Sequence, residues 1–106
     1  MSKVTILPAA TTTVTGDSFE ALNDGLGIFP NQTYQATVTG TGAVTATVII
    51  EFSNDGTNWL TGATISLSGT TSASDGFVSS ASWVYRRARV TAISGTSAAV
   101  VVTMGV

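Results

Sequence analysis

The stretch Thr45–Leu67, TATVIIEFSNDGTNWLTGATISL, predicts a β-hairpin and a buried sheet face. In its first half, apolar side chains occupy every second position, which places them on one face of a strand. These residues are Ala46, Val48, Ile50 and Phe52, and Val44, just before the stretch, continues the pattern. The central Asn54-Asp55-Gly56 is a turn signal, because Asp-Gly accepts positive φ at little cost. The second half places Trp59, Ala63, Ile65 and Leu67 on one face. An isolated hairpin is unstable in water, so we expect a second layer to cover this face.

The rest of the chain repeats this pattern of alternating segments and turn signals. Segments 32–39 and 83–93 alternate and 97–104 is predicted as the closing strand, while Gly40-Thr41-Gly42 and Ser94-Gly95-Thr96 are turn signals. We interpret Asn23–Gln32 and Ser68–Asp75 as loops. Segments spaced by roughly 8–12 residues are typical of antiparallel sandwiches. The prediction is an all-β, antiparallel β-sandwich, jelly-roll or Ig-like, with seven to eight strands.

Length indicates the number of domains, and the position of a proline indicates the conformation of the N-terminal segment. The 106 residues contain neither a repeat of fixed length nor a linker, which favours one domain over 1–106. Within residues 1–15, Pro8 removes a backbone donor, so this piece is either an edge strand or an extended N-terminal arm. The sequence leaves both interpretations open.

Composition limits the classes of partner. Charged residues make up 9% of the chain, against about 25% in average proteins, so Thr, Ser, Asn and Gly must form much of the surface. Two explanations fit this composition. The surface is adapted to close contact with another protein, or the chain is rich in Thr because branched residues favour strands. With a net charge of −2 and four basic residues, we expect no nucleic-acid partner. No secretory signal and no membrane-spanning run is evident, so we expect no membrane partner and synthesis in a cytoplasm.

The residues available for chemistry are few. The chain has no His and no Cys, which removes the commonest general base and all thiol chemistry. Asp24, Asp55 and Asp75 each precede Gly, a placement that turn geometry explains, and Glu51 falls on the solvent side of its strand's alternation. No Asp-x-Asp spacing suggests a calcium loop. We therefore expect no catalytic residue, no cofactor and no metal site.

The segment Trp83–Ile93, WVYRRARVTAI, carries most of the candidate contact residues. One face holds Trp83, Tyr85, Arg87 and Arg89, which are side chains typical of protein interfaces. The opposite face is apolar except for Arg86, whose head we expect to reach solvent or one of Glu51, Asp55 and Asp75, because an unpaired buried charge is costly.

Two further interpretations concern apolar and aromatic side chains near loops. The loop at Asn23–Gln32 carries Leu26, Ile28 and Phe29, either as a core contact or as a docking point. Trp59, Trp83 and Tyr85 either close the end of the core or stack on a ligand. The candidate interface is thus Leu26, Ile28, Phe29, Trp83, Tyr85, Arg87 and Arg89.

The run EFSNDGTNWLTGATISLSG, followed by SDGF and then WVYRRARVTAISGTSAAVVVTMG, resembles a family of small phage virion proteins of β-sandwich type. The resemblance covers roughly the last two thirds of the chain. It implies a non-enzymatic capsid decoration (cement) subunit that sits on the virion surface, binds the major capsid protein and forms a homo-oligomer, with a trimer as the implied order. The alternatives are a carbohydrate-binding module on a phage tail or fibre, since such sandwiches carry a similar SNDGTNW turn, and a tail or neck structural subunit.

Overall fold

The computed structural model describes residues 3–20, 32–79 and 83–105, and every regular element within them is a β-strand. Three strands are short: β1 (Lys3–Ala10), β2 (Val14–Thr15) and β3 (Phe19–Glu20). Three are long: β4 (Gln32–Ser53), β5 (Leu60–Ser79) and β6 (Tyr85–Gly105). No helix in this described part of the chain could span a membrane.

The six strands form one antiparallel sheet in the order β1-β6-β4-β5. β2 and β3 also pair with β6, through Val14–Val90 and Phe19–Arg86 among other register pairs. The prediction of an all-β antiparallel fold is confirmed. The prediction of seven to eight strands is not confirmed, because the pairing of the long strands continues through segments that the sequence suggested were breaks.

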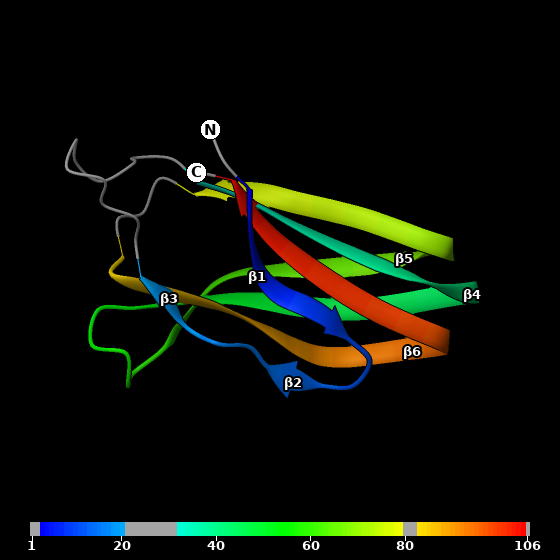
Figure 1. Ribbon diagram of the computed structural model, residues 1–106, viewed down its shortest axis with the longest axis horizontal. Coiled ribbons are helices and arrows are strands. Elements are labelled where there is room, and N and C mark those ends of the chain that lie inside the picture. Colours follow the sequence, from blue (N-terminus) through cyan, green and yellow to red (C-terminus); the bar gives the residue numbers. More distant parts are fainter. Residues whose placement is uncertain (1–2, 21–31, 80–82, 106) are drawn as a thin grey trace.

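The sheet folds back on itself. A straight strand of 22 residues would span roughly 70 Å, whereas the longest extent of the molecule is 45 Å. Tyr34 and Phe52 lie near opposite ends of β4, yet their ring centroids are 5.9 Å apart. Figure 1 shows β4, β5 and β6 each running to the right-hand end of the molecule and returning. Each long strand therefore has two arms.

The bends lie where the backbone adopts positive φ. These residues are Gly42 in β4, Thr71 in β5, and Gly95 and Ser97 in β6. Gly42 and Gly95 fall in the predicted turn signals, whereas Ser97 is the first residue of the predicted strand 97–104. In β5 the bend falls within Ser68–Asp75, whose prediction as a loop is wrong because the pairing with β4 resumes at Ser72. A turn signal thus marks a corner within a strand as well as a break between strands.

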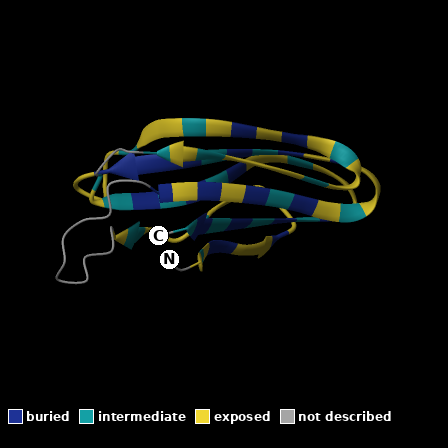
Figure 2. Ribbon diagram, turned by 90° about the horizontal axis from the view of Figure 1, so that it is seen from above, coloured by how far each residue is buried: buried dark blue, intermediate teal, exposed yellow. Residues whose placement is uncertain are grey.

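The core lies between the two folded halves of the sheet. Even-numbered residues of β4, from Tyr34 through Val48 to Phe52, are buried along both arms. Val90, Val100 and Val102 of β6 and Ile65 and Leu67 of β5 join them. Figure 2 shows buried and exposed residues alternating along the strands. The period of two read from the sequence is thus the pattern that builds this core.

β1 lies at one edge of the sheet and is paired with β6. Its register with β6 shifts twice, between Thr5 and Leu7 and between Leu7 and Ala10. Ile6, Leu7 and Ala10 are buried, whereas Pro8 and Ala9 are exposed. The described part of residues 1–15 thus begins with an edge strand, one of the two predicted alternatives.

The turn between β4 and β5 is held by side chains that bind its own backbone. Asp55 Oδ1 accepts hydrogen bonds from the amides of Thr57 and Asn58, both at 2.8 Å. Ser53 Oγ accepts one from the amide of Gly56 at 2.9 Å. The bonds from Asn58 above all hold the pKa of Asp55 well below its usual range. These contacts account for Asp55 as a turn residue, as the sequence predicted.

Candidate contact surface

A cluster of charged and aromatic side chains lies on the outer face of the sheet, near the β4–β5 turn. It consists of Glu51, Trp59, Tyr85, Arg87 and Arg89, and we name it the arginine patch. Tyr85, Arg87 and Arg89 share a face because β6 has a period of two. Glu51 of β4 is the register partner of Arg87, so pairing between two strands far apart in sequence assembles the patch.

Glu51 lies between the two arginines. Arg87 Nε donates a hydrogen bond to Glu51 Oε1 at 2.8 Å, and Arg89 Nε lies 3.5 Å from Glu51 Oε2. The second contact is an ion pair without hydrogen-bond geometry, since Arg89 Nε has no hydrogen-bond partner. Glu51 is 7% exposed. One carboxylate facing two guanidinium groups leaves the patch with an excess of one positive charge.

The ring of Trp59 holds Arg87 from the other side. Arg87 Cζ lies 4.1 Å from the ring centroid, within the range of a cation–π contact. Arg87 is thus fixed by a carboxylate and an aromatic face together. Tyr85 completes the patch against the turn, where a Cβ added to Gly56 would lie 3.6 Å from the Tyr85 ring.

The exposure of the two arginines differs. The side chain of Arg87 is 25% exposed and that of Arg89 is 38% exposed. Arg89 is therefore the more available of the two for a group on another molecule. Arg87 is already oriented, so a contact with it would cost little further side-chain entropy.

The structure brings together three of the seven predicted interface residues. Tyr85, Arg87 and Arg89 lie in the patch, whereas Trp83 is partly buried against the core. Leu26, Ile28 and Phe29 lie outside the described residues. Glu51 and Trp59 were not predicted as interface residues, because only the register between β4 and β6 and the course of the turn place them beside the arginines.

Arg86, on the opposite face of β6, is a buried cation. It is fully buried, so the prediction that its head reaches solvent is wrong. Its Nη1 donates to Tyr34 Oη at 3.0 Å, and its Nη2 donates to the carbonyl of Trp83. Glu51, one of its predicted partners, binds Arg87 and Arg89 instead. The reason is that Arg86 is the register partner of Phe52 and faces the core, whereas Glu51 is the register partner of Arg87 on the outer face.

Burial shifts the titration of the Arg86 pair. Desolvation raises the pKa of Tyr34 to about 12, against a smaller opposing effect of Arg86. Desolvation lowers the pKa of Arg86, and the nearby Tyr34 oxygen partly offsets this. Tyr34 in turn donates to Gln32 Oε1 at 2.9 Å. The pair therefore belongs to a buried hydrogen-bonded network in the core.

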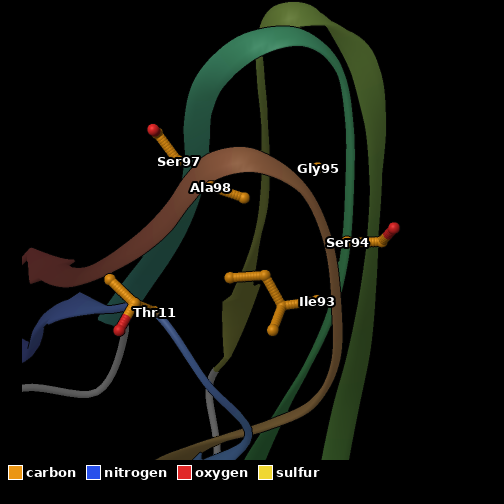
Figure 3. Close-up of a pocket in the computed structure, with 6 residues that line it drawn as sticks. All are labelled: Thr11, Ile93, Ser94, Gly95, Ser97 and Ala98. Carbon is orange, nitrogen blue, oxygen red and sulfur yellow. The ribbon is translucent and has the colours of Figure 1, made fainter.

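One pocket lies at the bend of β6, at the far end from the arginine patch. Thr11, Ile93, Ser94, Gly95, Ser97 and Ala98 line it. In Figure 3 the Ile93 and Ala98 side chains point into the bend, whereas Ser94 and Ser97 point away from it. All six residues are neutral, so this pocket offers neither an acid nor a base. Within the described ranges, no three acidic side chains gather where they could hold a metal ion.

These features define a class rather than a single protein: an all-β chain with one folded antiparallel sheet and a cationic, aromatic patch on its outer face. Comparison with protein-family models, curated proteins and solved structures yields no match to the chain.

Proposed function

We propose that the chain is a non-enzymatic structural virion protein, a phage capsid decoration subunit that binds the outside of the shell and stabilises it. The observation that carries this proposal is the arginine patch. It presents two oriented arginines and an aromatic ring on a body with only 9% charged residues. Arginine and aromatic side chains are the residues on which protein interfaces most often depend.

We further infer that the folded sheet serves as the two layers of a β-sandwich. Each long strand contributes one arm to each layer, β1 joins one layer, and β2 and β3 join the other. The contact between Tyr34 and Phe52 supports face-to-face packing of these layers. This architecture agrees with the phage virion family that the sequence resembles.

The partner on the shell is a carboxylate-bearing surface of the major capsid protein. A carboxylate neutralises the excess positive charge of the patch and can accept a hydrogen bond from Arg89. A subunit that binds only the assembled shell raises shell stability by mass action. No chemical step is involved.

The direct test mixes purified protein with shells of the phage that carries it. We expect the protein to sediment with the shells and to raise their melting temperature. Arg89→Glu reverses the charge of the most exposed patch arginine and should weaken binding about tenfold or more, as a lost charged contact of at least 1.4 kcal/mol would.

The matched control is Lys3→Glu, which makes the same change of charge on the exposed Lys3 of β1. It should leave shell binding close to the unmodified level. Protein that neither sediments with shells nor changes their melting would contradict the proposal.

The alternatives gain no specific support from the patch. Arg87 occupies one face of the Trp59 ring, and Trp83 is partly buried against the core, so each ring has less free surface for a sugar than an exposed ring would have. Imaging of particles with and without the subunit separates the capsid from the tail and neck. A glycan-array signal that Trp83→Ala abolishes would favour the carbohydrate-binding alternative instead.

A further inference from the structure

The two outer edges of the sheet differ in how well they are protected. The order β1-β6-β4-β5 places β1 at one edge and β5 at the other. An edge strand presents unpaired N–H and C=O groups that can pair with another strand. Natural proteins block such edges with proline, lysine or β-bulges.

The β1 edge carries all three of these protections. Lys3 begins the strand and Pro8 lies within it. The two register shifts, between Thr5 and Leu7 and between Leu7 and Ala10, break the regular spacing of its backbone groups. A strand from another molecule therefore finds few well-placed partners on β1.

The β5 edge carries none of them along its first arm. From Ala63 to Thr70 its register with β4 is unbroken. This segment, ATISLSGT, contains no proline and no charged residue. Ile65 and Leu67 point into the core, whereas Thr64, Ser66 and Ser68 are exposed. Among the described residues, only β4 pairs with it.

The second arm of β5 is less suited to pairing with itself. Asp75 lies there, exposed, and Gly76 follows it. A copy of this arm laid antiparallel across it near Asp75 would bring two carboxylates together, which is unfavourable. The first arm has no such conflict, because Thr and Ser side chains meet Thr and Ser across the new contact and can form hydrogen bonds there.

We propose that the β5 segment Ala63–Thr70 pairs antiparallel with the same segment of a second copy of this chain, so that the sheet continues across a two-fold axis. The contact uses the same segment on both copies, and it therefore closes at a dimer. A trimer, as the family resemblance implies, needs β5 to meet a different surface of its neighbour. The protected β1 edge does not provide one.

This inference rests on the proposed decoration subunit and deepens it, by specifying the homo-oligomer that the family resemblance implies, but its test needs no shells. Failure of self-association therefore leaves shell binding untouched, and failure of shell binding leaves the dimer untouched. The arginine patch and the β5 edge are altered by separate variants.

The first experiment is sedimentation velocity on the intact chain over a series of concentrations. We expect a monomer–dimer equilibrium. Ser66→Lys places two like charges near each other at the contact and should raise the dimer Kd about tenfold or more. Thr5→Lys adds the same charge on the opposite edge and should leave Kd unchanged. Far-UV circular dichroism checks that both variants fold.

The second experiment needs no charge at the contact. Because the chain has no cysteine, a single introduced cysteine reports only its own neighbours. Of Thr64→Cys, Ser66→Cys and Ser68→Cys, at least one should form a disulfide-linked dimer under mild oxidation, whereas Thr5→Cys should not. A wild-type chain that stays monomeric or forms trimers overturns the proposal. So does a Ser66→Lys dimer of unchanged affinity, or linkage through Thr5→Cys alone.

Discussion

Arg86 Nη1 donates a hydrogen bond to Tyr34 Oη at 3.0 Å, and in the described part of the chain no carboxylate forms an ion pair with this arginine. Their Cα atoms belong to different strands and different halves of the folded sheet. The bond therefore ties the first arm of β6 to the first arm of β4 through the core. Four predictions follow from this bond, from the arginine patch and from the strand bends.

A double-mutant cycle tests whether Tyr34 matters mainly as the acceptor for Arg86. Tyr34→Phe removes the acceptor and should destabilise the protein by about 1–3 kcal/mol, because a buried donor loses its partner. Arg86→Met removes the buried charge while keeping an apolar side chain, and in that background Tyr34→Phe should cost clearly less. Urea unfolding measures each free energy. Equal costs in both backgrounds would show that the bond contributes nothing.

Stability should fall in alkali because of Tyr34. The pKa of Tyr34 is about 12 in the folded protein, whereas the ordinary value for a tyrosine is 10.0. The unfolded chain therefore releases this proton first, so the contribution of Tyr34 is fully present below pH 10 and is lost between pH 10 and about 12. Absorbance titration of tyrosinate in the Tyr85→Phe variant isolates Tyr34, since the chain has two tyrosines. A Tyr34 midpoint at its ordinary value would contradict the burial argument.

Glu51→Gln should expose how far the arginine patch depends on its carboxylate. The variant leaves Arg87 and Arg89 facing each other without a counter-charge, so we expect a loss of about 1 kcal/mol in the free energy of unfolding. Added salt should reduce this loss by screening the two arginines. Glu20→Gln is the matched control at an exposed position. An equal effect of both variants, or no effect of salt, would argue against a coupled patch.

Thr71→Gly should stabilise the protein. Thr71 has a φ of 65°, which a β-branched residue adopts only with strain. Glycine removes the strain but adds freedom to the unfolded chain, so the net gain should be no more than about 1 kcal/mol. Thr70→Gly, one residue earlier in the regular ladder, should instead destabilise. Thermal unfolding of both variants gives the comparison, and a loss of stability at both positions would disprove strain at Thr71.

Local pattern predicted the core faces but not the pairing between distant strands. The alternation through Val48, Ile50 and Phe52 placed these residues correctly, because a period of two is a property of one strand alone. Glu51 was assigned to the solvent side, and it does lie on the outer face. Its burial between Arg87 and Arg89 depends on the register of β4 with β6, which no local pattern contains.

The same limit explains the errors at the bends and at Arg86. Ser68–Asp75 is polar and was predicted as a loop, yet β5 is an edge strand whose outward-facing residues are exposed, so polar residues suit a strand there. Arg86 was expected to reach a carboxylate. Because β4 folds back on itself, Tyr34 reaches Arg86 instead. No local sequence pattern indicates that the two ends of one strand come into contact.

The place of β6 in the sheet has a consequence for synthesis on the ribosome. β6 is made last, yet it lies between β1 and β4 and pairs with both. β1 therefore has no described strand to pair with until β6 has emerged. The sheet that the structure describes can form only after β6 has been synthesised, and until then the uncharged β5 segment is exposed to neighbouring nascent chains.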